Sequence, residues 1–237
     1  FRMKLNPAKC TFGVPAGKLL GFLVSSRGIE VNPVKIRAIE RMTVPRELKD
    51  VQKFTGSLAS LSRFVSRLGE KALPLYALMK KSDTFVWTPQ ADAAFKELKT
   101  MLATAPILAS PLEREPMLLY IAATNRVVSV VVVVEGEEEG KTVQRPVYYL
   151  SEVLSLSKQN YPHFQKMTYG VFMAATKLKH YFEEHPMKVV SEAPISDIMC
   201  NKDASGRIAK WAIQLSPYVP VYERRDAIKS QALADFL

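Results

Sequence analysis

Six residues at helical spacing could together bind a polyanion. We expect one helix from Pro45 to Leu68, in which positions three and four residues apart share a face. The residues that recur at these intervals are Lys49, Lys53, Gly56, Ser60, Arg63 and Arg67. Gly costs an exposed helix about 1 kcal/mol relative to Ala, so Gly56 among cations suggests a partner within backbone distance. A nucleic-acid duplex fits, because cations contact its phosphates while Gly and Ser leave room for sugars. A basic stripe alone is usually a solvated helix face, and here the small residues favour the binding interpretation.

The net positive charge of the chain is confined to its first part. The 237 residues carry a formal net charge of +10, with 18 Lys+Arg against 8 Asp+Glu in residues 1–110 and 15 of each in the remainder. This asymmetry indicates nucleic acid or an anionic membrane surface as a partner of the first part, against the simpler interpretation of a basic soluble surface. Hydrophobic residues make up 48% and charged residues 24%, which is typical of a globular protein and excludes a disordered tail.

Metal and redox chemistry find little support in the sequence. Cys10 and Cys200 lie far apart, and His163, His180 and His185 are dispersed, so we expect neither a zinc site nor a disulfide. The longest apolar run, residues 130–134 with Val127 and Val128 just before it, is shorter than the ~20 residues of a membrane helix. The chain has neither an initiator Met nor a signal peptide, so we expect a piece of a longer intracellular polypeptide with no membrane partner.

Turn residues and apolar periodicity predict the elements that position these residues. Gly and Pro among short apolar runs indicate hairpins before residue 24, and helical periodicity follows from residue 33, with shorter helices over 71–80 and 89–102. Three prolines between 106 and 116 mark a domain boundary. Beyond it we expect strands at 117–123, 127–134 and 143–150 with an acidic turn at 135–140, a helix at 163–182, a strand at 187–191, a helix at 208–215 and a strand at 218–222. The fold class is therefore α+β followed by α/β.

Several ordered motifs resemble gypsy-type (LTR) retrotransposon Pol polyproteins. They are Leu5-Asn6-Pro7-Ala8-Lys9-Cys10-Thr11-Phe12-Gly13, Leu19-Leu20-Gly21-Phe22-Leu23-Val24, Ile29-Glu30-Val31-Asn32-Pro33-Val34-Lys35-Ile36, Trp87-Thr88-Pro89, Ala105-Pro106-Ile107-Leu108, Gly206-Arg207-Ile208-Ala209-Lys210-Trp211 and Ala232-Leu233-Ala234-Asp235-Phe236.

The resemblance implies a division of the chain. Residues 1–32 correspond to the C-terminal end of the reverse transcriptase palm, with Leu20, Gly21 and Phe22 in the primer-grip hairpin that contacts nucleic acid. Residues 33–108 correspond to the helical thumb, 109–116 to a linker, and 117–237 to an RNase H-like, connection-type domain with a mixed sheet and flanking helices.

The carboxylates that such enzymes need are mostly missing. The polymerase motif of the family lies upstream, and no Asp-Asp pair occurs in this chain, so we expect no polymerisation by this segment alone. RNase H chemistry needs converging carboxylates on two divalent ions. The corresponding positions hold Asn125, Gln165 or Met167, and Glu192, so we expect a degenerate site with no metal or cofactor, and Mg²⁺ only in the intact parent enzyme.

Three functions remain open. The first is sequence-independent binding of an RNA–DNA hybrid or DNA duplex, with upstream palm and fingers and a downstream RNase H and integrase of the same polyprotein as further partners. The second is an active RNase H that uses Glu192 with Asp197 or Asp203, although both aspartates are more typical of helix caps. The third is an element relic or a domesticated interaction module.

Overall fold

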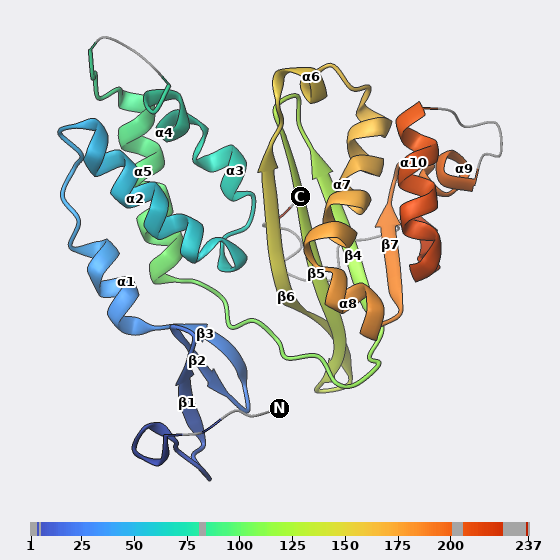
Figure 1. Cartoon of the computed structure of the whole chain (residues 1–237), viewed down its shortest axis with the longest axis horizontal. Coiled ribbons are helices and arrows are strands. Elements are labelled where there is room, and N and C mark those ends of the chain that lie inside the picture. Colours follow the sequence, from blue (N-terminus) through green and yellow to red (C-terminus); the bar gives the residue numbers. More distant parts are fainter. Residues whose placement is uncertain (1–3, 5, 81–83, 201–205, 225–235, 237) are drawn as a thin grey trace.

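A computed structural model of the chain describes residues 4, 6–80, 84–200, 206–224 and 236. At the N-terminal end, a short 3-10 helix (η1, Pro7–Lys9) precedes an antiparallel sheet of order β1-β2-β3, formed by Ala16–Leu19, Phe22–Ser25 and Gly28–Val31 (Figure 1). Leu20 and Gly21 connect β1 to β2 with φ angles of 50° and 84°. Positive φ at both turn positions matches the right-handed twist of the strands, which explains the glycine at the tip.

A helical segment follows over residues 33–108. Its elements are α1 (Pro33–Glu40), α2 (Leu48–Ser60), η2 (Ser62–Phe64), α3 (Leu68–Lys71), α4 (Leu73–Leu78) and α5 (Pro89–Ala103). The side chains of Asn32 and Thr88 accept backbone N–H bonds at the starts of α1 and α5, and each helix has Pro in its first turn. These caps explain where α1 and α5 begin.

The expected single helix from Pro45 to Leu68 is wrong at both ends. The helix α2 begins at Leu48 and ends at Ser60, and Arg67 further along has a φ of 52°. The reason is tertiary packing: η2 contacts β6 of the large sheet described next, and Leu61, Phe64 and Val65 are all buried in a core shared with that sheet.

The large sheet is mixed, with five strands in the order β6-β5-β4-β7-β8. The strands β4 (Met117–Ala123), β5 (Val127–Glu138) and β6 (Lys141–Val153) form an antiparallel meander, while β7 (Met187–Ser191) and β8 (Val221–Arg224) extend it in parallel. The flanking helices are α6 (Leu156–Gln159), α7 (His163–Lys177), α8 (Lys179–Glu184), α9 (Ile195–Cys200) and α10 (Gly206–Leu215).

Several predicted boundaries differ from the structure. The helix expected over 71–80 is replaced by α3, which ends at Lys71, and α4, which ends at Leu78, and the strand expected over 143–150 spans Lys141–Val153. The acidic run expected as a turn mostly extends β5, and the turn itself is confined to Glu139 and Gly140, which both have positive φ. The helix expected over 163–182 is interrupted at Leu178, which separates α7 from α8. The last strand begins at Val221, because Ser216–Tyr218 form a 3-10 helix (η3).

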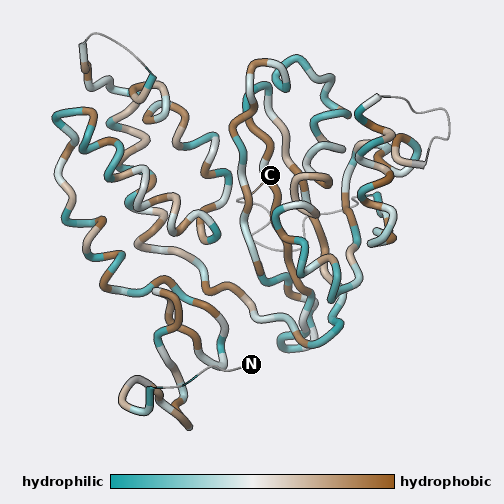
Figure 2. Tube along the Cα trace, in the orientation of Figure 1, coloured by the Kyte–Doolittle hydropathy of each residue, from teal (hydrophilic) through white to brown (hydrophobic). Residues whose placement is uncertain are grey.

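Each face of the large sheet contributes to a different core. Met117, Leu119 and Val130 pack with α7, α8 and α10, whereas Leu118, Tyr120 and Val131 on the opposite face join the core of the helical segment. Strand β5 is therefore apolar on both faces, as the brown colouring of its middle in Figure 2 shows. Phe236 is fully buried in the core that the sheet shares with the helical segment. The predicted domain boundary is thus crossed by a continuous core.

The segment 109–116 has no helix or strand but is fixed where it begins. Ile29 and Leu108 exchange backbone hydrogen bonds of 2.8 and 2.9 Å, and the Ala109 N–H donates to the Pro146 carbonyl at 2.7 Å. In the described part of the chain, no helix is both long and apolar enough to cross a membrane.

Candidate nucleic-acid interface and strand-end cavity

Four of the six predicted positions lie on one exposed face of α2. Lys49, Lys53, Gly56 and Ser60 are all exposed, while Val51, Phe54, Thr55 and Leu58 bury the opposite side of the helix. A Cβ built on Gly56 meets no heavy atom within 4 Å. Packing within the chain therefore does not require a glycine here, and the space above it is open to a partner. We call these four residues the α2 row.

Arg63 and Arg67 do not extend this row, which corrects the prediction of a six-residue stripe. Both lie beyond the end of α2, so helical spacing no longer aligns them with Lys53. Arg67 donates from Nε and Nη2 to Glu70 Oε2 at 2.8 and 2.6 Å. The guanidinium of Arg63 lies over two aromatic rings, 5.5 Å from the centroid of Phe22 and 4.6 Å from that of Tyr148.

The β1–β2 hairpin exposes its tip beside a cation. Leu20 is 88% exposed, whereas Phe22 is half-buried and packs on Phe64 with ring centroids 5.7 Å apart. The Lys35 Nζ lies 5.4 Å from the centroid of Phe22 and 2.8 Å from where a Cβ on Gly21 would be. The hairpin is therefore anchored by Phe22 on the segment that follows α2, and the tip is left accessible.

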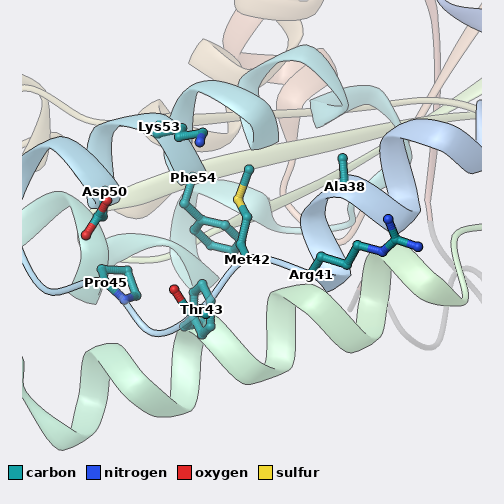
Figure 3. A pocket seen from close by; sticks show the side chains of 9 residues that line it. Ala38, Arg41, Met42, Thr43, Pro45, Asp50, Lys53 and Phe54 are labelled. Carbon is teal, nitrogen blue, oxygen red and sulfur yellow. The ribbon is translucent and has the colours of Figure 1, made fainter.

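A cavity of about 360 Å³ places a third cation, Arg41, next to the two lysines of the α2 row (Figure 3). Arg41 at the end of α1 and Lys53 of the row both line it, together with Phe54 and Met42. The carboxylate in the lining, Asp50, accepts a hydrogen bond from the Arg46 backbone N–H at 3.0 Å. The lining thus contains two cations and one carboxylate, and this excess of positive charge favours the binding of anionic groups.

A larger cavity of about 580 Å³ lies where β4 and β7 end beside the start of α7. Tyr120 pairs with Val190 in the parallel ladder, so Ala122 and Glu192, each two residues further on, come to the same level at this edge. Met167 and His163 of α7 complete the side of the cavity. Glu192 is the one carboxylate among its described lining residues.

The predicted RNase H positions are only partly brought together. Met167 and Glu192 line the cavity, but Asn125 and Gln165 do not. Asn125 is exposed in the β4–β5 turn, where its carbonyl accepts from Lys166 Nζ at 3.2 Å, and Ala122 and Ala123 occupy the strand edge instead.

This cavity does not fit a pair of divalent ions. Hard cations require several anionic oxygen ligands, and among the described lining residues Glu192 alone supplies a carboxylate. Among the residues that the structure describes, no group of three or more His, Cys, Asp or Glu could hold a metal. Asp197 lies in the first turn of α9 and lines a neighbouring cavity with Glu192, while Asp203 falls outside the described residues.

A charged cluster that the sequence did not predict joins the end of β6 to α6 and α7. Glu152 accepts hydrogen bonds from Lys158 Nζ at 2.8 Å, Tyr169 OH at 2.7 Å and Lys177 Nζ at 3.0 Å. Burial acts to raise the pKa of Glu152, but the hydrogen bonds and the Lys177 charge outweigh it and lower the pKa to about 2. No sequence signal identifies the cluster, because its members belong to three elements, and its role is to tie those elements together.

The sheet order and flanking helices define the class of the second part as an RNase H-like α/β fold. Residues 87–189 match the family described as the RNase H-like domain found in reverse transcriptase, a match that begins before α5 and so includes part of the helical segment. The resemblance noted in the sequence is confirmed at this level.

Two retrotransposon polyproteins are similar to this chain over nearly its whole length. The chain is similar to the retrovirus-related Pol polyprotein from transposon opus of Drosophila melanogaster, with 25% identity over 229 residues, covering 91% of this chain and 22% of the relative. It is also 25% identical over 219 residues to the transposon Tf2-3 polyprotein of Schizosaccharomyces pombe, covering 90% of this chain and 16% of the relative. The chain thus spans about a fifth of the length of these relatives, and it resembles their reverse transcriptase and RNase H region.

Solved structures support the fold. The foamy viral protease-reverse transcriptase in complex with an RNA/DNA hybrid gives a TM-score of 0.74 at 20% identity, covering 90% of this chain and 30% of that one. A complex of the foamy viral protease-reverse transcriptase dRH with ds DNA gives 0.73 at 18% identity, covering 90% of this chain and 38% of that one. The predicted arrangement of a helical part followed by a mixed sheet with flanking helices is confirmed.

Proposed function

We propose that this chain binds a template–primer duplex, either RNA–DNA hybrid or DNA, as the thumb and connection portion of a larger reverse transcriptase. The observation that carries the proposal is the α2 row, in which Lys49 and Lys53 precede Gly56 and Ser60 on one exposed face with open space above the glycine. Lysines contact phosphates, and small residues admit the sugar backbone. Arg41 lines a cavity with Lys53 of this row, and we assign the exposed tip of the β1–β2 hairpin to the same duplex-binding function.

The basic first part and the structural neighbours support a duplex as the partner. Residues 1–110 carry the whole +10 excess. The two neighbours reported above are complexes with an RNA/DNA hybrid and with ds DNA. We expect no base specificity, because the α2 row offers cations and small side chains and no amide aimed at base edges.

The second part of the proposal is that the RNase H-like domain does not cleave and acts as a scaffold. Its strand-end cavity has one described carboxylate, and the sequence contains no Asp-Asp pair for polymerisation. Polymerase chemistry with Mg²⁺ then belongs to palm and fingers of the same polyprotein, with a downstream RNase H and integrase as further partners in an intracellular particle or the nucleus.

A gel-shift experiment on a 20-base-pair RNA–DNA hybrid tests the binding surface. Lys49→Glu with Lys53→Glu should abolish the shift at protein concentrations that saturate wild type. The matched control, Lys96→Glu with Lys179→Glu, removes the same charge from exposed i,i+4 ion pairs elsewhere and should keep most of the affinity. Equal losses in both double variants would refute the α2 row as the binding surface.

A cleavage assay tests the scaffold role. The wild-type chain, incubated with the same hybrid in Mg²⁺ or Mn²⁺, should leave the RNA strand intact. Cleavage that disappears in Glu192→Gln would instead establish an active RNase H.

A further inference from the structure

Arg63 is packed among aromatic side chains from three elements. Its guanidinium carbon lies 4.6 Å from the centroid of Tyr148 in β6 and 5.5 Å from that of Phe22 in β2. Burial raises the pKa of Tyr181 in α8, and the charge of Arg63 and a hydrogen bond from it oppose this rise. The Nε of Arg63 is buried without a hydrogen-bond partner. A side chain held in this way is poorly placed to contact a phosphate.

The three aromatic partners belong to parts of the chain that are far apart in sequence. Phe22 follows the exposed tip of the β1–β2 hairpin, whereas Tyr148 and Tyr181 belong to the large sheet and a helix beside it. Arg63 itself lies in η2, directly after α2. It is therefore the point at which the hairpin, the end of the α2 row and the large sheet meet.

We propose that Arg63 is a positioning residue whose planar guanidinium, stacked on Phe22 and Tyr148, fixes the β1–β2 hairpin relative to the large sheet. A guanidinium stacks on aromatic faces in a way that the compact ammonium of Lys does not reproduce. In consequence the hairpin tip and the α2 row face a duplex as one surface. This consequence rests on the proposed function, whereas the positioning itself does not.

Hydrogen exchange on the free full chain tests the positioning alone. Arg63→Met keeps the aliphatic stem, and Arg63→Lys keeps the charge. Both should speed exchange of the amides in residues 22–25 by about fivefold, because each removes the stacking. Arg67→Met is the control and should leave the hairpin unchanged, since Arg67 pairs with Glu70. Unchanged hairpin exchange in both Arg63 variants, or an equal rise throughout β5, would overturn the proposal.

The salt dependence of hybrid binding separates positioning from phosphate contact. Both Arg63 variants should weaken binding of a 20-base-pair hybrid by about fivefold with the same salt slope as wild type. Lys53→Met should instead reduce the magnitude of the slope of log affinity against log salt by about 1. If Arg63→Lys kept the wild-type affinity and salt slope while Arg63→Met had a shallower salt slope, Arg63 would contact a phosphate and the proposal would be overturned. If the wild-type chain does not bind the hybrid, the proposed function fails, and the exchange experiment still decides the role of Arg63.

Discussion

Replacing Gly56 with alanine should strengthen the fold and weaken duplex binding. Gly56 lies in the middle of α2, is exposed, and has no heavy atom within 4 Å of a built Cβ. Alanine there should raise the free energy of unfolding by about 1 kcal/mol, because Gly is the poorer helix former and nothing is displaced. The same methyl group projects into the gap that we assign to the duplex backbone. A misfit of about 1.4 kcal/mol at a close-packed contact corresponds to a tenfold loss of affinity.

Urea denaturation and fluorescence anisotropy with a labelled hybrid measure the two effects. Thr100→Ala is the matched control, because Thr100 is exposed on α5, where alanine is likewise the better helix former, and should change affinity little. Unchanged stability in Gly56→Ala would refute the account of the helix. Unchanged affinity would refute close approach of a backbone at Gly56.

Three further predictions concern the fold and the strand-end cavity. Gly69→Ala should lower the free energy of unfolding by about 1–3 kcal/mol in urea melts, because its Cβ would lie 2.6 Å from Ser151 Oγ and 3.0 Å from a Val127 methyl. The pKa of Glu152 is lowered from 4.5 to about 2, so its ionised form should add of order 3 kcal/mol to the free energy of unfolding above pH 4.5. This contribution is lost as the pH falls toward 2. Melts of Glu152→Gln should lack that part of the pH dependence. Ala122→Asp combined with Met167→Glu should produce Mn²⁺ binding in calorimetry, because both positions line the cavity with Glu192. The control Asn125→Asp with Gln165→Glu should not, and equal binding by both pairs would contradict the cavity geometry.

The order of strands and helices was predictable because each has a local signal. Runs of β-branched residues such as 127–134 indicate buried strands, and Asn32-Pro33 marks the start of a helix. The motifs of the resemblance supplied what local pattern cannot, namely that the meander and the later strand form one mixed sheet.

The end of α2 was not predictable from periodicity. Leu61, Val65 and Leu68 continue the apolar spacing of the preceding helix, so the pattern has no break at Ser60. Burial against the large sheet decides the bend, and with it the roles of Arg63 and Arg67. The periodicity therefore predicted one row for Arg63, Arg67 and the lysines of α2, whereas both arginines lie beyond the end of the helix.

The strand-end cavity was only half predictable for a related reason. Motif alignment locates Met167 and Glu192, but which residue of the first strand faces them depends on the register of β4 against β7. That register brings Ala122 to the edge and leaves Asn125 in the turn, where it does not line the cavity.

The salt dependence of hybrid affinity tests the central claim most directly. Each neutralised phosphate contributes about 0.9 to the slope of log affinity against log salt, or about fivefold in affinity at physiological salt. This slope is negative, so Lys49→Ala with Lys53→Ala should make it shallower by about 1.8. The same double variant should bind the hybrid about 30-fold more weakly than wild type. The same slope and affinity in wild type and double variant would contradict duplex binding through the α2 row.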